Sequence, residues 1–181
     1  MRNYCIKIAL RGVSPMIWRR LQIPGHTSLA DLHHIIQIVN GWDDEHLHRF
    51  HIYGKDYGIA YAGGLSFSDD AHLVFIDDFA FDVGDRFIYE YNFFEHWLHD
   101  IRIETIETVS TLTNHPSCVK GNGMPGATRY DEVERTIDLV NAIIDSNEST
   151  TVGDIRYQIE ALDAVRFNRK KVNYRLADMS I

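Results

Sequence analysis

The stretch from Arg86 to Thr105 limits the possible folds more than any other part of the chain. In two successive runs every second residue points to one face, the period of a strand that is buried on one side. The first run carries Phe87, Tyr89, Tyr91 and Phe93, and the second carries Trp97, His99, Ile101 and Ile103. Two such runs joined by a short turn near Phe94 and Glu95 predict an antiparallel hairpin with a large aromatic face.

Other segments add strands and loops around this hairpin. The same two-residue period predicts strands over residues 4–10, 17–23 and 46–53, with a further candidate at 72–76. Glycine, proline and aspartate mark the connections, because these residues favour turns. The expected loops cover residues 54–70, where a short strand stays open, and 114–127, and a turn at 82–85 precedes the hairpin.

Helical patterns occur early and late in the chain. Residues 28–40 repeat apolar side chains every 3.6 positions, with Ser28 and Asp31 at capping-box spacing and Gly41 as the stop. Later helices are expected over residues 131–145 and about 153–162, and 167–176 is either helical or irregular. These elements predict an α+β fold: a mainly antiparallel sheet with an early helix and C-terminal helices packed on it. We expect one domain over residues 1–181.

Length and composition indicate an ordinary globular domain. The 181 residues are 45% hydrophobic and 12% aromatic, enough for a core without disulfides or metals. No apolar run approaches the roughly 20 residues that span a bilayer, so no membrane partner is expected. With two cysteines and no signal-peptide pattern, the expected location is cytoplasmic.

Charge is distributed unevenly. The net charge is −8, and residues 69–104 hold ten acids against two bases, which suggests a basic partner surface. Residues 166–175 hold five bases and no acid. Duplex DNA is an unexpected partner because a dominant basic face is missing. A local nucleic-acid contact through Arg169, Lys170 and Lys171 stays open, although a solvated helix face is the preferred interpretation.

Ten histidines raise the question of a metal site. His46 and His48 lie two apart on an expected strand and so share a face, and His99 lies in the aromatic hairpin. A divalent metal such as zinc could use these three as ligands. The preferred interpretation has no cofactor and hydrogen-bonded structural histidines. His99 is then expected to be buried and neutral, with its ring bonded to a carbonyl or polar side chain.

The aromatic residues have a similar double interpretation. Large aromatic side chains first serve core burial, and they can also line a groove for a ligand. The expected core includes Leu32, Ile36, Trp42, Phe50, Tyr91 and Trp97. The candidate ligand-binding set is Trp42, His46, His48, Tyr91, Trp97 and His99.

Residues for covalent catalysis are hard to identify. Cys118 has Lys120 nearby, which can lower a thiol pKa, but without an adjacent base it is interpreted as a packing cysteine. The sequence has neither a Gly-x-Ser-x-Gly elbow nor a Gly-x-x-x-x-Gly-Lys phosphate loop. No catalytic residue is assigned.

A set of short motifs occurs in order along nearly the whole chain. They are Tyr4-x-Ile6-x-Ile8-x-Leu10, Pro15-x-Ile17-Trp18-Arg19-Arg20, Leu32-His33-x-x-Ile36-Gln37, Gly41-Trp42, His46-Leu47-His48-x-Phe50, Tyr89-x-Tyr91-Asn92-Phe93, Trp97-x-His99, Pro116-x-Cys118-x-x-Gly121, Phe167-Asn168 and Val172-Asn173-x-x-Leu176. With them the chain resembles the plasmid pRiA4b ORF-3-like family, a bacterial and archaeal group frequent on mobile elements. It resembles a divergent member, because Asn92-Phe93-Phe94-Glu95 stands where relatives have Asp-Phe-Gly-Asp.

The resemblance implies a protein carried by a plasmid, phage or transposon, with no assigned reaction. Three hypotheses follow, in this order. The first is a non-enzymatic binding module that recognises a protein or small ligand. The second is a metal-dependent hydrolase or nuclease that uses a histidine cluster. The third is nucleic-acid binding through the basic C-terminal segment.

Overall fold

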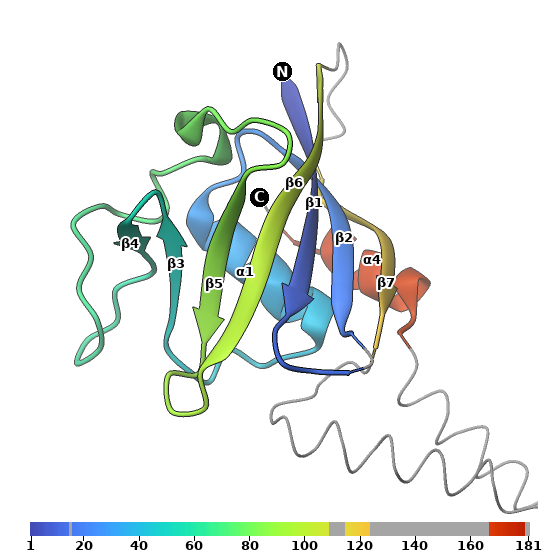
Figure 1. The fold of residues 1–181 in the computed structure, drawn as a ribbon. Coiled ribbons are helices and arrows are strands. Elements are labelled where there is room, and N and C mark those ends of the chain that lie inside the picture. The colour runs from blue at the N-terminus through green and yellow to red at the C-terminus, as the bar shows by residue number, and fades with distance from the viewer. Residues whose placement is uncertain (15, 109–114, 124–166, 180–181) are drawn as a thin grey trace, which may run out of the picture.

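The computed structural model describes residues 1–14, 16–108, 115–123 and 167–179. Seven strands form a single antiparallel sheet in the order β4-β3-β5-β6-β1-β2-β7 (Figure 1). The strands are β1 (Arg2–Leu10), β2 (Trp18–Pro24), β3 (His48–Ile52), β4 (Lys55–Tyr57), β5 (Arg86–Tyr91), β6 (Trp97–Thr108) and β7 (Ser117–Asn122). The helices are α1 (Leu29–Asn40), the short 3-10 helix η1 (Ile76–Phe79) and α4 (Arg169–Ala177). The predicted α+β class is confirmed.

The predicted aromatic hairpin is confirmed as β5 and β6. Its register pairs Tyr91 with Trp97 and Tyr89 with His99, so the rings share the inward face. The turn between them uses left-handed backbone at Asn92 and His96, with φ of 57° and 51°. Strand β6 lies at the centre of the described sheet and pairs with β1 on its other side.

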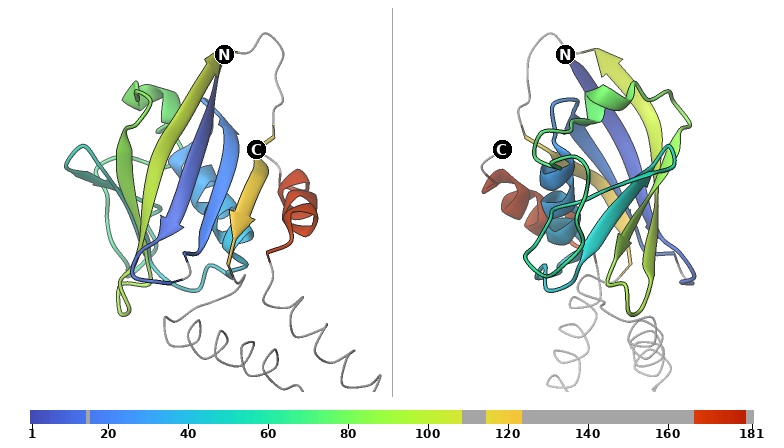
Figure 2. Two further views of the ribbon diagram at one scale, coloured as in Figure 1. Left: turned by 45° about the vertical axis from the view of Figure 1, so that its right-hand side comes forward. Right: turned by 90° about the vertical axis from the view of Figure 1, so that its left-hand side faces the viewer.

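Helix α1 covers one face of the sheet, and α4 lies on the same side beside β7 (Figure 2). The capping box of Ser28 and Asp31 is confirmed by reciprocal side-chain and backbone hydrogen bonds. Gly41 ends the helix in left-handed conformation at φ 73°, which favours glycine. Buried Arg19 of β2 donates from Nε to the Val39 carbonyl at 2.8 Å, placing a cation at the C-terminal end of α1.

The structure corrects several predicted elements. Residues 72–76 do not form a strand; they lead into η1, and only Phe75 makes an isolated bridge, to Ser28. Residues 114–127 are not all loop, because β7 pairs with β2 there. Strand β3 begins at His48 rather than His46. The undecided segment 167–176 contains α4, and the helices predicted at 131–145 and 153–162 lie outside the described residues.

All six side chains predicted for the core are buried. Their exposed fractions are 0% for Leu32, Ile36 and Phe50, 6% for Trp42, 3% for Tyr91 and 1% for Trp97. Among the described residues no helix is long and apolar enough to cross a membrane.

Trp97 offers a direct test of this core. Trp97→Ala is expected to destabilise the fold by about 3–5 kcal/mol, because a large buried side chain would leave a cavity. Phe94, two residues into the same turn and 97% exposed, is the matched control. Phe94→Ala should change stability by less than about 0.5 kcal/mol in urea unfolding. Equal effects of the two substitutions would contradict the packing.

Candidate functional site

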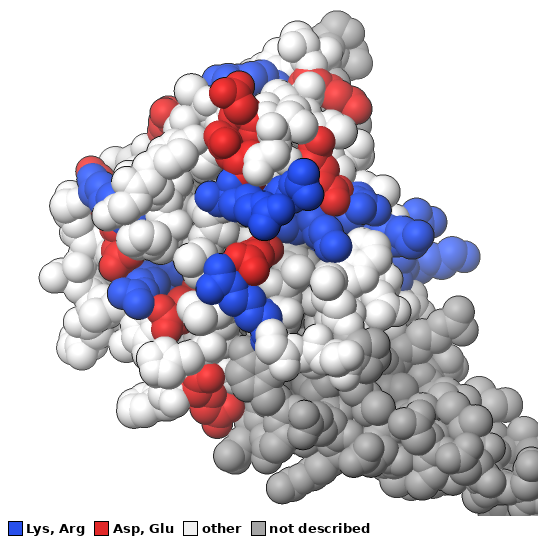
Figure 3. All heavy atoms as spheres, viewed as in Figure 1, with Lys and Arg blue, Asp and Glu red and all other residues white. Residues whose placement is uncertain are grey.

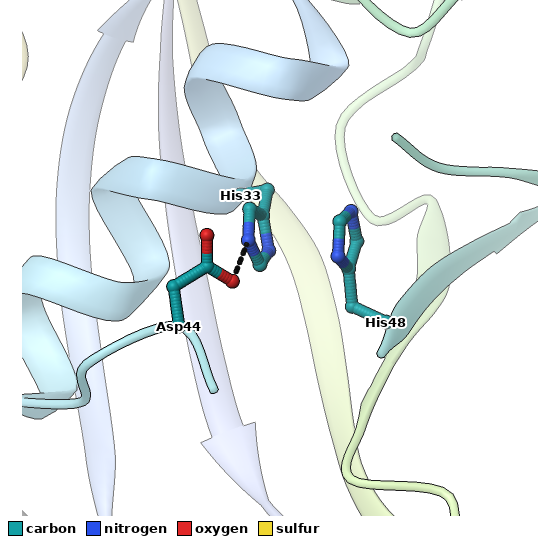
Figure 4. A group of neighbouring side chains, drawn as sticks. All are labelled: His33, Asp44 and His48. Atoms are coloured by element: carbon teal, nitrogen blue, oxygen red, sulfur yellow. Dashed lines mark hydrogen bonds and ion pairs between the residues drawn. The ribbon is translucent and has the colours of Figure 1, made fainter. Parts of the chain in front are cut away.

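Three ligand-type side chains meet between α1 and the sheet (Figure 4). His33 comes from α1, Asp44 from the segment after it, and His48 from the first position of β3. One possible ligand atom from each lies within 4.8 Å of the other two. His33 and His48 are buried, whereas the Asp44 side chain is 29% exposed. We call these three residues the histidine–aspartate site.

The end of α1 positions Asp44. After the Gly41 stop, the Trp42 backbone N–H donates to the Gln37 carbonyl, which turns the chain back along the helix. The Asp44 backbone N–H donates to the Gln37 side-chain oxygen at 3.1 Å. Asp44 itself is left-handed at φ 56°, a conformation that aspartate tolerates better than most residues. This turn brings the carboxylate back to His33 of the same helix.

Hydrogen bonds define the proton positions on His33. The Gln37 amide donates to the Tyr89 hydroxyl at 2.9 Å, so that hydroxyl has its own proton to give to His33 Nδ1, also at 2.9 Å. His33 Nε2 lies 2.7 Å from an Asp44 oxygen and therefore carries the proton that it donates to the carboxylate. Both nitrogens of His33 are thus satisfied, and a neutral imidazole fits these contacts by accepting at Nδ1 and donating from Nε2.

His48 is not satisfied in the same way. Its ring stacks on His33 with centroids 3.5 Å apart and planes at 10°. Its Nε2 accepts the Ile59 backbone N–H at 3.4 Å, which leaves the remaining ring proton on Nδ1. That buried Nδ1 has no hydrogen-bond partner in the described part of the chain. An orphaned buried donor costs roughly 1–3 kcal/mol, so this position calls for an explanation.

Burial keeps both imidazoles neutral. Burial, together with the charge of the neighbouring His33 and against the opposing effect of Asp44, lowers the pKa of His48 to about 2. Burial also lowers the pKa of His33, against the opposing effect of Asp44. Burial raises the pKa of Asp44, but its hydrogen bond from His33 prevails and holds that pKa below the usual value. At neutral pH the site therefore holds two neutral imidazoles and one carboxylate, the protonation states in which these groups bind metal.

This ligand set matches zinc chemistry. Two imidazole nitrogens and a carboxylate oxygen are zinc donors, and a site with three protein ligands leaves a fourth position for water. Ligands on tetrahedral zinc lie roughly 3.4 Å apart, so the side chains must close in from their present separation. Because the two rings are nearly parallel, one of them must also turn for both lone pairs to reach one ion.

The structure brings only one of the three predicted metal ligands into this site. His48 lies in it, whereas His46 is exposed, with its ring 5.5 Å from that of Tyr91. His99 lies in the aromatic core, where its Nδ1 lies 3.2 Å from the Trp97 carbonyl. His33 and Asp44 were not predicted as ligands. His33 does stand at the edge of the apolar stripe of the helix, but nothing in the sequence pairs it with His48.

The other predicted ligand-binding side chains pack on one another. The Trp42 ring stacks on Tyr91 at 4.9 Å and meets Trp97 and His99 edge-on at 5.4 and 5.2 Å. All four are buried. The expected burial and hydrogen bond of His99 are confirmed, and burial lowers its pKa to about 4. A ligand-binding role for this set stays a prediction.

The predicted nucleic-acid residues lie on α4. Arg169, Lys170 and Lys171 are all exposed in its first turn. Arg169 donates from Nη1 to the Val119 carbonyl of β7 at 3.2 Å, so this basic turn adjoins the β7 edge of the sheet.

Comparison with known proteins identifies the family. The sequence-family model of the plasmid pRiA4b ORF-3-like proteins matches residues 2–173. The chain belongs to this family. A relative from Sinorhizobium fredii (strain NBRC 101917 / NGR234), the uncharacterized protein y4hQ, is 32% identical over 108 residues. That match covers 59% of this chain and 56% of the relative, so the chain spans little more than half of the relative's length.

A solved structure of another protein has the same fold. The protein of unknown function MM3350 from Methanosarcina mazei Go1 superposes with a TM-score of 0.69 and 23% identity. The similarity covers 94% of this chain and 96% of that one. The likeness supports the architecture and carries no activity.

The buried histidines predict how stability depends on pH. The unfolded chain protonates its histidines as pH falls through about 6.5, whereas folded His48 and His99, with pKa values near 2 and 4, stay neutral. The free energy of unfolding should therefore be flat above about pH 7.5 and fall by about 1.4 kcal/mol per pH unit for each residue below pH 6.

Urea unfolding between pH 7.5 and 5 measures this slope, and His99→Gln should reduce it by about one histidine's share. A profile that is flat from pH 7 to pH 5 would contradict the neutral, buried state of these rings.

Proposed function

We propose that this chain is a non-enzymatic binding module that takes one divalent transition-metal ion, best matched by zinc, at the histidine–aspartate site. The observation that carries the proposal is the buried, unpartnered Nδ1 of His48 beside His33 and Asp44. A metal ion at that nitrogen binds its lone pair, so the ring proton moves to Nε2 and the long 3.4 Å contact from the Ile59 N–H is given up. The bond to the metal removes the larger cost of leaving the buried Nδ1 unsatisfied.

The donor types favour zinc over harder cations. Calcium and magnesium prefer oxygen ligands, whereas two neutral imidazoles suit zinc and its neighbours. Asp44 is the side chain through which an ion reaches the site, because it alone of the three is partly exposed. Tyr89 stands behind His33 and can accept its Nδ1 proton when Nε2 turns to the metal, as second-layer partners of metal-bound histidines do.

An ion at this site joins elements that are distant in sequence. It would tie α1 to the first residue of β3 and to the turn that carries Asp44. Binding to the folded state alone stabilises it, by about 2.7 kcal/mol at a metal concentration one hundred times Kd. The module is then loaded and stiffened before it meets its own target, for which we propose a protein or small ligand in the cytoplasm of a cell carrying a mobile element. A basic target surface fits the acidic segment 69–104.

The cysteines support a binding role over covalent catalysis. Cys118 is buried, and burial raises the pKa of its thiol to about 11. Burial also raises the pKa of Cys5. The thiolate is the nucleophilic form, so both are poor nucleophiles at neutral pH.

Zinc titration of the purified protein tests the proposal. At pH 7.5 we expect saturable binding of one ion per chain, measured by calorimetry and by competition with a chromophoric chelator. His48→Gln and Asp44→Asn should each weaken binding by more than about tenfold, and Tyr89→Phe by roughly 10–100-fold. His51→Gln is the matched control, because His51 lies on the same strand with an exposed ring bonded to Asp56.

Metal-free melting curves show whether each variant folds. Asp44→Asn should lose the least packing of these variants, because the Asp44 side chain is 29% exposed. Absence of stoichiometric binding by the wild type would overturn the proposal. So would equal weakening by His51→Gln, which would indicate scattered binding to surface histidines.

A metal-dependent hydrolase is the second candidate, favoured by one feature of the site. Three protein ligands leave a coordination position for water, and the 29% exposure of Asp44 gives a substrate a route to it. Zinc-loaded protein is expected not to hydrolyse bis-p-nitrophenyl phosphate faster than free zinc does. Hydrolysis that His48→Gln abolishes and His51→Gln retains would assign the hydrolase instead.

A further inference from the structure

Five basic residues stand opposite one another on five neighbouring strands. The register pairs Arg86 of β5 with Arg102 of β6, Arg102 with Lys7 of β1, Lys7 with Arg20 of β2, and Arg20 with Lys120 of β7. With strands about 4.8 Å apart, the row runs roughly 19 Å across the sheet, perpendicular to the strands. We call these five residues the cationic row.

The cationic row lies on the face of the sheet opposite α1 and α4. In β5, β6, β1 and β2 the residues adjacent to the row, such as Phe87, Ile101, Ile6 and Leu21, are buried, so the basic residues of these strands alternate to the open side. Lys120 of β7 is exposed at the position opposite Arg20. No described element covers that side (Figure 2). Figure 3 shows Lys and Arg side chains as a band across this face, continuing toward the basic turn of α4.

Two carboxylates partly offset the charge of the row. The hydrogen bond from Arg20 lowers the pKa of Glu104, and the charges of Lys7 and Arg102 lower it further. The hydrogen bond from Arg11 lowers the pKa of Asp100, and the charge of Arg86 adds to that effect. Glu104 forms an ion pair with Arg20. It is the extra residue of the bulge at Cys5 and Ile6, where the register of β1 and β6 shifts. Within the described residues the other four row members form no ion pair. Like charges directly opposite on neighbouring strands destabilise a sheet, so the arrangement costs stability unless an anion lies over it.

An aromatic ring accompanies the row. The Lys7 ammonium lies 5.1 Å and the Arg20 guanidinium 5.2 Å from the centre of the Trp18 ring, on the same open face. Trp18 is half-buried, whereas Trp42 and Trp97 are 6% and 1% exposed. It is therefore the tryptophan that a ligand on this face can contact.

We infer that the cationic row binds the phosphate backbone of a single-stranded nucleic acid laid across the strands, with a base against Trp18. Positive grooves with stacking aromatic side chains are the common means of holding single strands. Three of the five residues are arginines, and one guanidinium group can bind two oxygens of the same phosphate at once. An acidic peptide would be attracted by the same charges, but its carboxylate side chains have no ring to stack on Trp18.

The charge of the rest of the molecule limits this binding. At −8 overall, the chain as a whole repels polyanions, so binding at the row depends on local contacts. For a single strand, log Kobs falls with log salt by about 0.7 for each phosphate neutralised, and four or five contacts give a slope of roughly −3.

Fluorescence anisotropy with a labelled 20-nucleotide oligo-dT tests the inference. The wild type should bind at low salt with a slope of roughly −3, and the double variant Arg86→Gln, Arg102→Gln should flatten the slope by about 1.4. The matched control is Arg2→Gln with Lys55→Gln, which removes two exposed charges outside the row, with side chains 41% and 46% exposed. The control should keep the wild-type slope.

Two further arms separate the occupants. Bound oligo-dT should quench tryptophan fluorescence in the wild type and leave it unchanged in Trp18→Phe. Poly-glutamate and inorganic polyphosphate should compete more weakly than oligo-dT, because neither has a base. No oligo-dT binding at low salt, equal slopes for the row and control variants, or tighter binding of poly-glutamate would each overturn the inference.

Discussion

The packing of α1 on the aromatic face of β5 and β6 is the interaction on which the rest of the structure depends. Burying that face removes large rings from water, the dominant stabilising effect in a domain of this size. Leu29, Leu32, Ile36 and Val39 of the helix are all fully buried. The capping box and Gly41 set where the helix starts and stops, and so set which residues it presents to the sheet.

The histidine–aspartate site lies within that packed layer, where polar groups are costly. Tyr89 and Gln37 explain how His33 is accommodated, because each of its nitrogens has a partner. His48 stacks on His33 and leaves one nitrogen unpartnered, which is unusual in a site otherwise so completely bonded. This contrast between the two rings is the basis of the metal proposal. A histidine present only for packing would be expected to find a carbonyl, as His99 does.

The two faces of the sheet therefore present different chemistry. The covered face holds aromatic rings and a small polar site. The open face holds the cationic row, which runs across neighbouring strands. Strand alternation produces this division without any special segment, because successive residues point to opposite sides. The metal proposal and the single-strand proposal concern opposite faces, and either can fail without the other.

Local sequence was enough to determine the hairpin, helix α1 with its two ends, and the six buried core residues. These features depend on period, caps and turns, which neighbouring residues encode. Local sequence gave the wrong element at residues 72–76, an apolar run that forms no strand, and in part of 114–127, a glycine-bearing run that contains β7. Runs of either kind occur both in strands and in loops. Local sequence also could not join His33 and Asp44 to His48, because that meeting depends on how the turn after α1 folds back over β3. The cationic row could not be predicted from the sequence for the same reason. Its five members become neighbours only when strand pairing sets their register: Arg86, Arg102, Lys7, Arg20 and Lys120. Register is a property of hydrogen bonds between distant segments, and only the tertiary structure decides it.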